Sequence, residues 1–124
     1  MADDKHAKGM ALRTQLWGEK GAKAGDEFLS GFDPDFGKFL NDELFGTIWT
    51  RPGLPVKARS MITMAALIAL GRGPELRVHM RGALNLGITP AEIKEIIIHL
   101  SQYSGVPTAV EAIRAFGEVT APKK

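Results

Sequence analysis

The sequence contains no cysteine. This absence excludes disulfides, thiol nucleophiles, thiolate metal ligands and dithiol redox chemistry. Long hydrophobic runs are missing too: the longest strongly apolar stretch, Met61 to Leu70, is too short to cross a bilayer. The N-terminal segment carries charges where a signal peptide would need an apolar run. We therefore expect a cytoplasmic protein that does not associate with a membrane.

A strong charge of one sign is also absent. The 16 Lys and Arg residues nearly balance the 14 Asp and Glu residues, leaving a net charge of +2. The basic residues are scattered and are not interleaved with aromatic residues as on a nucleic-acid surface, so we expect no nucleic-acid partner. The chain is 44% hydrophobic and 24% charged, as globular proteins are. Its 124 residues predict one domain, spanning residues 1–124.

Glycine and proline divide the chain into segments of helical length, and no segment alternates as a half-buried strand does. The sequence therefore predicts an all-α bundle of six or seven helices. Helices are expected at Asp4 to Trp17, Pro34 to Leu44, Val56 to Leu70, Pro74 to Leu86, Pro90 to near Gly105, and from Pro107 onward, with a short helix or turn around Phe28 to Phe32.

Local signals fix several of these boundaries. Gly18 and Gly21 are expected to end the first helix, and Asp33 to cap the helix that Pro34 opens. Thr89 and Glu92 form a capping-box pattern around Pro90. The segment from Val56 to Leu70 is apolar nearly all round, which predicts a central buried helix or one that a partner subunit covers further.

The helix from Pro74 carries the first candidate for chemistry. Glu75 and His79 lie about 40° apart on neighbouring turns, and Arg72 would point the same way if the helix extended back to it. His79 lies at the edge of the apolar stripe. A carboxylate one turn away would orient the imidazole and raise its pKa, while shelter from water would lower it. The pair suits a proton donor, but it also suits a structural histidine with a surface partner.

The next helix repeats this arrangement, because His99 shares a face with Ile96 and Tyr103, and Glu92 lies two turns back. His99 is a second candidate for chemistry, or else a core or interface residue. A metal site would combine His79, His99, Glu75 and Glu92. The His-Glu-x-x-His and Glu-x-x-His metal motifs are both absent.

The loop from Trp49 to Pro55 contains two prolines and a glycine in seven residues, which excludes regular helix, and we expect its prolines to make it stiff. Arg51 in this loop is a candidate clamp for a carboxylate, since a guanidinium binds a carboxylate with two hydrogen bonds. The alternative is a solvated loop charge.

Together these residues resemble the carboxymuconolactone decarboxylase family. The resemblance covers nearly the whole chain and rests on residues in the loop and in both histidine-bearing helices. They are Trp49-Thr50-Arg51-Pro52-Gly53-Leu54, Arg59-Ser60, Gly71-Arg72, Glu75-Leu76, His79, Arg81, Ala83, Gly87, Thr89, Glu92-Ile93, Glu95, His99, Tyr103, Gly105 and Pro107, with Gly9, Arg13 and Gly18 near the start. Alkylhydroperoxidase relatives carry a Cys-x-x-Cys pair, for which Arg72 and Glu75 stand here, so the resemblance points to the decarboxylase branch.

The resemblance implies an AhpD-like helical fold that forms homo-oligomers such as trimers or hexamers. It implies loss of CO2 from a lactone carboxylate, 4-carboxymuconolactone, to give 3-oxoadipate enol-lactone without a cofactor. The implied catalytic residues are His79, Glu75 and His99, and the implied substrate-binding residues are Arg51, Arg72, Trp49 and Tyr103. Two alternatives remain open: a non-enzymatic oligomeric binding or assembly module, and an enzyme for another lactone or a 2-oxo acid.

Overall fold

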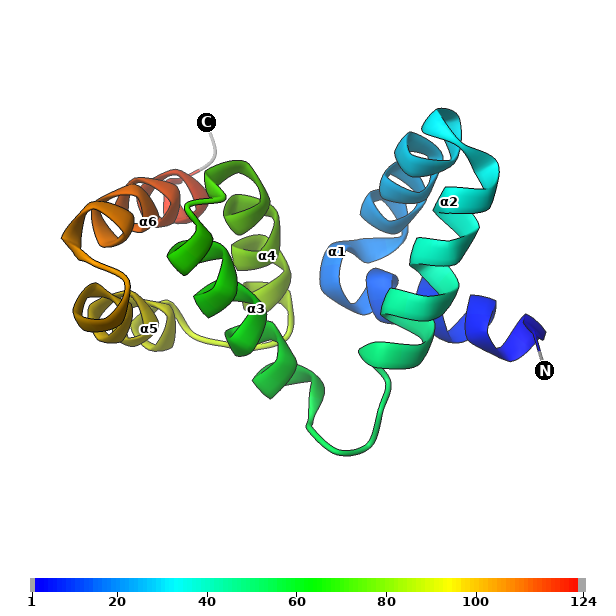
Figure 1. Cartoon of the computed structure of the whole chain (residues 1–124), viewed down its shortest axis with the longest axis horizontal. Coiled ribbons are helices and arrows are strands. Elements are labelled where there is room, and N and C mark those ends of the chain that lie inside the picture. The colour runs from blue at the N-terminus through cyan, green and yellow to red at the C-terminus, as the bar shows by residue number, and fades with distance from the viewer. Residues whose placement is uncertain (1, 123–124) are drawn as a thin grey trace. The chain divides into compact units, whose positions relative to one another are not determined.

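A computed structural model of the protein describes residues 2–122, and all regular structure in that range is helical (Figure 1). The prediction of an all-α fold is confirmed. The elements are α1 Ala2–Phe32, α2 Pro34–Phe39, the π-helix η1 Leu40–Ile48, α3 Val56–Leu70, α4 Gly73–Asn85, α5 Pro90–Tyr103 and α6 Val106–Thr120. The chain divides into two compact units, Met1–Val56 and Lys57–Lys124. That the two units together form one domain, as the sequence predicts, stays a prediction.

In the first unit, α1 is two helical segments joined at Gly18. The backbone of Gly18 has φ 77° and ψ 169°, outside the helical region. The predicted break at Gly18 is therefore confirmed. The predicted end at Gly21 is wrong, because the helix resumes and continues to Phe32. A glycine inside a helix costs only about 1 kcal/mol, which the packing of α1 against η1 and α2 can offset.

Close approaches hold α1 against η1. A Cβ added to Gly9 would lie 2.3 Å from the carbonyl oxygen of Asn41, and one added to Gly46 would lie 2.1 Å from that of Lys5. Between the helices lies the almost fully buried guanidinium of Arg13. It donates to Asp26 at 3.3 Å and to Asn41 at 3.4 Å, and it lies over the ring of Phe45. Arg13, one of the residues of the family resemblance, is therefore part of the packing of this unit.

The predicted caps of α2 and α5 are confirmed. The Asp33 carboxylate accepts from the Phe36 amide at 2.8 Å. At α5, the Glu92 amide donates to the Thr89 hydroxyl at 3.1 Å, and the Thr89 amide donates to the Glu92 carboxylate at 2.9 Å. These hydrogen bonds satisfy amides that a helix start leaves without partners.

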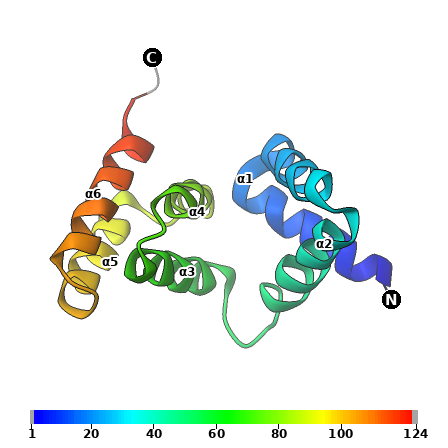
Figure 2. The ribbon, with the colours of Figure 1, turned by 45° about the horizontal axis from the view of Figure 1, so that its top comes forward.

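In the second unit, α6 packs on both α4 and α5 (Figure 2). The core is made of aliphatic side chains and methionines from α3 to α6: Met64, Ile68, Leu76, Met80, Ala83, Ile88, Ile93, Ile97, Ala109, Ala112 and Ala115. Arg77 of α4 also donates to Glu118 and Glu111 of α6. The core and this ionic cluster fix the position of α4, the helix that carries His79.

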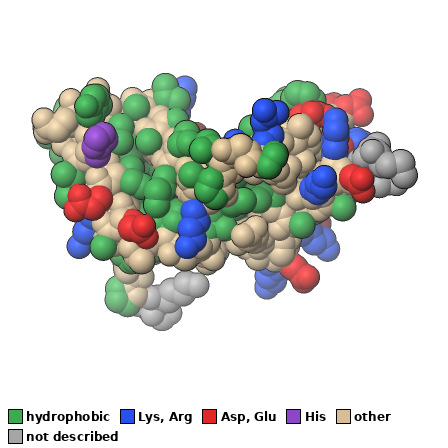
Figure 3. Space-filling model, turned by 90° about the horizontal axis from the view of Figure 1, so that it is seen from below, with side chains coloured by type: hydrophobic (Ala, Val, Ile, Leu, Met, Phe, Trp, Pro, Cys, Tyr) green, Lys and Arg blue, Asp and Glu red, His purple; other side chains and the backbone are tan. Residues whose placement is uncertain are grey.

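Helix α3 is not the central buried helix of one chain. Its buried residues are Ser60, Met64 and Ile68, whereas Ile62 is 56% and Leu70 69% exposed. Hydrophobic side chains spread over a face of the second unit, on the left in Figure 3, with a histidine and acidic side chains among them. Only the other expectation for α3, cover from a partner subunit, stays open. Within residues 2–122, no helix is long and apolar enough to span a membrane.

Candidate active site

His79 lies on α4 at the edge of its buried face. Leu76, Met80 and Ala83 of the same helix are fully buried, whereas His79 is half-buried. This is the edge position that the sequence predicts. Burial lowers the pKa of the imidazole below its ordinary value of 6.5, because removal from water disfavours the charged form. The ring is therefore mainly neutral at pH 7, and a neutral imidazole can donate its N–H to an oxyanion.

Glu75 lies one turn before His79 and is exposed. Among residues 2–122, its carboxylate has no hydrogen bond or ion pair. Burial is the cause of the lowered His79 pKa, with no opposing contribution from Glu75. The structure thus places the two residues on neighbouring turns, but the Glu75 carboxylate makes no hydrogen bond with the His79 imidazole. Orientation of His79 by Glu75 stays a prediction.

His99 and Tyr103 are brought together on α5. Their rings stack with centroids 5.1 Å apart and planes 23° apart. Both residues are exposed, and Tyr103 is 79% exposed. The stacked rings form a flat aromatic surface beside a groove.

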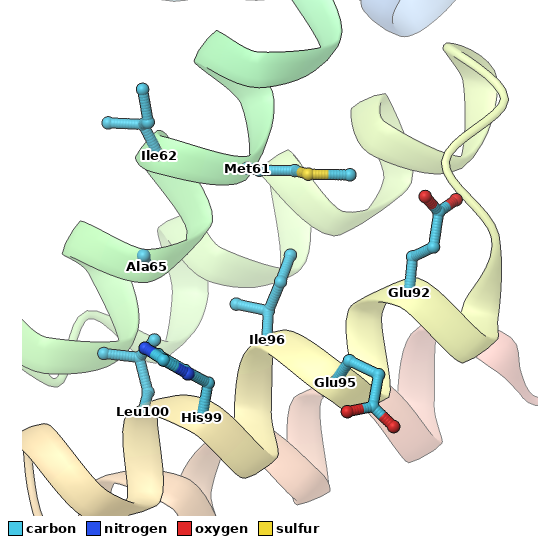
Figure 4. A pocket seen from close by; sticks show the side chains of 8 residues that line it. All are labelled: Met61, Ile62, Ala65, Glu92, Glu95, Ile96, His99 and Leu100. Atoms are coloured by element: carbon cyan, nitrogen blue, oxygen red, sulfur yellow. The ribbon is translucent and has the colours of Figure 1, made fainter.

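The groove lies between α3 and α5 and has a volume of about 460 Å³ (Figure 4). That volume is within the usual range for small-molecule sites. Its lining residues are Met61, Ile62, Ala65, Glu92, Glu95, Ile96, His99 and Leu100. In Figure 4, Ile96 and Met61 extend into the space between the two helices, and Glu95 points away from α3. No local pattern in the sequence indicates the α3 side of the groove, because only the fold brings α3 and α5 together.

The charges of this groove suit an apolar body better than an anion. Its side chains are apolar apart from His99 and the two carboxylates of Glu92 and Glu95, and it has no Lys or Arg among its lining residues. Hydrogen bonds from the amide and hydroxyl of Thr89 lower the pKa of Glu92, so this carboxylate stays ionised at neutral pH. An anionic substrate would need cationic side chains from elsewhere.

The other predicted substrate-binding residues have different surroundings. Trp49 is 5% exposed and packs against Phe45 with ring centroids 6.4 Å apart, so it belongs to the core of the first unit. Arg51 is exposed and lines a hollow of about 360 Å³ together with Lys5 and Lys8. No local pattern in the sequence connects either lysine with Arg51, because their position in one hollow depends on the contact of α1 with η1.

Arg72 precedes α4 and is exposed. Its backbone carbonyl accepts from the Leu76 amide at 2.9 Å. The helix does not extend back to Arg72, which is its N-cap with φ −94° and ψ 72°, so the condition under which Arg72 would point the same way as Glu75 and His79 is not met. Contact of Arg72 with a substrate stays a prediction.

The four residues of the alternative metal site do not form one. Across the part of the chain that the structure describes, no three His, Asp or Glu side chains are grouped so that they could hold a metal ion.

Several known proteins are similar in sequence to this chain over most of its length. Residues 34–118 match the Carboxymuconolactone decarboxylase family. The chain is 41% identical to a 4-carboxymuconolactone decarboxylase of Acinetobacter baylyi, with 94% of this chain and 87% of that protein covered. It is 40% identical to a nitrosuccinic acid decarboxylase of Metarhizium robertsii over 61% of this chain and 53% of that protein. It is 31% identical to an uncharacterized 15.0 kDa protein of Paracoccus denitrificans, covering 77% and 79% respectively.

The family match contains His79, His99, Glu75, Arg51, Arg72, Trp49 and Tyr103, all within residues 34–118. The match covers well over half of the chain, and the Acinetobacter relative extends the likeness to nearly its full length. This chain belongs to the carboxymuconolactone decarboxylase family.

Proposed function

We propose that this protein is a decarboxylase that converts 4-carboxymuconolactone into 3-oxoadipate enol-lactone. The observation that carries the proposal is the 41% identity with a protein named 4-carboxymuconolactone decarboxylase across 94% of this chain. The half-buried His79 adds a group that can interact with developing negative charge.

The proposed reaction needs no cofactor, because the substrate is its own electron acceptor. The departing carboxylate lies on a ring carbon that is conjugated, through the ring alkene, with the lactone carbonyl. When the C–C bond breaks, its electron pair moves into the ring and onto the carbonyl oxygen, which gives a furan-like enolate and CO2. One proton added to a ring carbon then gives the enol-lactone. Other decarboxylases use pyridoxal phosphate or thiamine to accept this electron pair.

The protein must therefore bind a dianion, stabilise an oxyanion and deliver one proton. Arg51 and Arg72 are the proposed carboxylate partners, and Tyr103 is proposed to contact the substrate. Trp49, in contrast, is buried in the core of the first unit and has little surface for a substrate. His79 is the proposed oxyanion or proton-transfer group, positioned by Glu75, with His99 as the second candidate. A bound dianion would raise the pKa of His79, so substrate binding would favour the protonated imidazole over the neutral form.

A second candidate substrate is nitrosuccinic acid, which the name of the Metarhizium relative favours. Nitrosuccinate has a nitro group on the carbon that bears one of its carboxylates, so loss of CO2 leaves a nitronate. The same requirements apply: a dianion to bind, an oxyanion to stabilise and a proton to deliver. That relative matches only 61% of this chain, so we place 4-carboxymuconolactone first.

The proposed enzyme is a homo-oligomer, a trimer or hexamer, located in the cytoplasm. The exposed side chains of Ile62 and Leu70 on α3 support assembly, because monomeric proteins seldom expose wide apolar surfaces. The alternative is an oligomeric module without activity.

Parallel assays of the purified protein test the substrate. CO2 release is measured with 4-carboxymuconolactone, with nitrosuccinate and with the saturated lactone that lacks the ring alkene. We expect release from the first at a kcat/KM well above that for the second, and none from the third. Faster turnover of nitrosuccinate would reverse the order of the two substrates, and no release from either would support the non-enzymatic module.

A further inference from the structure

Two adjoining hollows on the first unit have complementary chemistry. The hollow of about 360 Å³ is lined by Lys5, Lys8 and Arg51, with Asp4 as its one carboxylate. The neighbouring hollow, of about 420 Å³, is lined by Ala11, Leu12 and Val56, with Gln15 and Lys8. Lys8 and Thr50 line both hollows. A small ligand with an anionic group and a compact apolar body would find a partner for each part here.

The three cations differ in their availability. The Lys5 ammonium is 3.2 Å from the Glu43 carboxylate, so its charge is already paired. Lys8 is exposed and has no hydrogen bond or ion pair within residues 2–122. Lys8 therefore has a charge that an anion can bind, in the hollow that Arg51 also lines.

The two threonines that line the cationic hollow, Thr47 and Thr50, already use their hydroxyl hydrogens within the protein. The Thr50 hydroxyl donates to the Gly46 carbonyl at 2.8 Å, and the Thr47 hydroxyl donates to the Asp42 carbonyl at 2.9 Å. Neither hydroxyl hydrogen is free for a ligand, so an anion must be held by the ammonium and guanidinium groups. Gly46 lies so close to the backbone of Lys5 that this part of η1 is held against α1.

From this juxtaposition we propose that the paired hollows bind a small cyclic carboxylate. Lys8 and Arg51 hold the carboxylate, and the ring lies against Ala11, Leu12 and Val56. The ligand class rests on the proposed function, whose substrate and product are both lactones that carry a carboxylate. Lys8 is thus a residue that distinguishes lactone carboxylates from neutral lactones.

The test measures binding without turnover. The probe is 5-oxotetrahydrofuran-2-carboxylate, which has no ring alkene and so cannot lose CO2 into its carbonyl, and its affinity is measured by calorimetry on the full chain. We expect Lys8→Met to weaken binding about tenfold or more, as loss of a charge-assisted contact does, and Lys8→Arg to retain most of it. Lys20→Met removes the same charge from an exposed lysine outside both hollows and should leave the affinity within about twofold. Ala11→Gln should weaken binding by filling the apolar hollow.

The ligand series separates the sources of binding. Neutral γ-butyrolactone should bind at least tenfold more weakly than the carboxylate, and inorganic phosphate should not compete at equal concentration. The inference is overturned if the wild-type protein does not bind the probe, if Lys8→Met and Lys20→Met have equal effects, or if phosphate binds as well as the lactone carboxylate. Lys8-dependent binding without CO2 release would sustain this inference while the proposed function fails. CO2 release from a protein whose probe affinity does not depend on Lys8 would sustain the proposed function and overturn this inference.

Discussion

Burial of the His79 imidazole favours its neutral form, because it lowers the pKa of the ring below the ordinary value of 6.5. The lowered pKa makes it a neutral hydrogen-bond donor in the free protein, which favours stabilisation of the enolate oxygen as its first role. Proton delivery by the same ring would require the bound dianion to raise its pKa. A substitution of His79 that keeps an N–H donor but cannot titrate could restore the oxyanion role and not the proton-delivery role.

We expect His79→Ala to lower kcat by roughly 10²–10⁴-fold, the usual contribution of a positioned acid, base or oxyanion partner. His79→Gln keeps an N–H donor, so it should recover activity only if the oxyanion role dominates. Circular dichroism and light scattering must show that each variant folds and assembles as the wild type does. A folded His79→Ala variant within a few-fold of the wild-type rate would move the assignment to His99.

The same burial predicts a pH dependence of stability. The pKa of His79 is below 6.5 in the folded protein and near 6.5 in the unfolded chain, so the unfolded chain binds more protons between these two values. The free energy of unfolding contributed by this group is therefore full above pH 6.5, falls as the pH is lowered toward the folded pKa, and levels off below it. His79→Gln removes that contribution.

Urea unfolding at pH 7.5 and at pH 5.5 measures this effect. The wild type should lose more stability than His79→Gln over this range, because the other titrating groups are shared. Equal losses in the two proteins would mean that burial of His79 does not penalise its charge.

At the scale of the helix, the structural features that the sequence predicts are the local ones. Asp33 and Thr89 cap helices through hydrogen bonds to residues three positions away, and His99 stacks on Tyr103 one turn later. A sequence pattern contains this information directly. The continuation of α1 past Gly21 was not predictable, because it depends on packing against α2 and η1.

The same limit applies to the sites. The groove between α3 and α5 joins Met61 to Leu100, and the cationic hollow joins Lys8 to Arg51. Each combines segments about 40 residues apart, and no local pattern connects them. The sequence therefore predicted His99 and Arg51 as individual candidates but not the surroundings of either.

The crossing of α1 and η1 predicts a matched pair of glycine substitutions. In Gly46→Ala the new methyl group would meet the Lys5 carbonyl oxygen at 2.1 Å, whereas in Gly53→Ala it would have no neighbour within 4 Å. We expect Gly46→Ala to lower the free energy of unfolding by about 1–3 kcal/mol, as overpacking does, and Gly53→Ala to change it by less than about 0.5 kcal/mol. Urea unfolding of both variants is the measurement. Equal free energies of unfolding for the two variants would show that α1 and η1 do not approach each other closely at Gly46.

At the scale of the whole molecule, the exposed apolar surface of the second unit predicts assembly. Ile62 lies on α3 and lines the groove, and it is 56% exposed. We expect light scattering at micromolar protein to give a trimer or hexamer, and Ile62→Lys to shift the population toward the monomer because a charge would be buried at the interface. Leu54→Lys, a similar change at a 42% exposed loop position, is the comparison. A wild-type monomer of 13.4 kDa would contradict the prediction.

The central claim is decarboxylation in which the lactone accepts the electrons. The most direct measurement follows CO2 and enol-lactone together after the wild-type protein has been dialysed exhaustively against EDTA and supplied with 4-carboxymuconolactone. We predict undiminished activity and one enol-lactone formed for each CO2, because the ring carbonyl takes the electron pair. Activity that is lost on dialysis and restored by a divalent metal would contradict this account, as would substrate consumption without CO2.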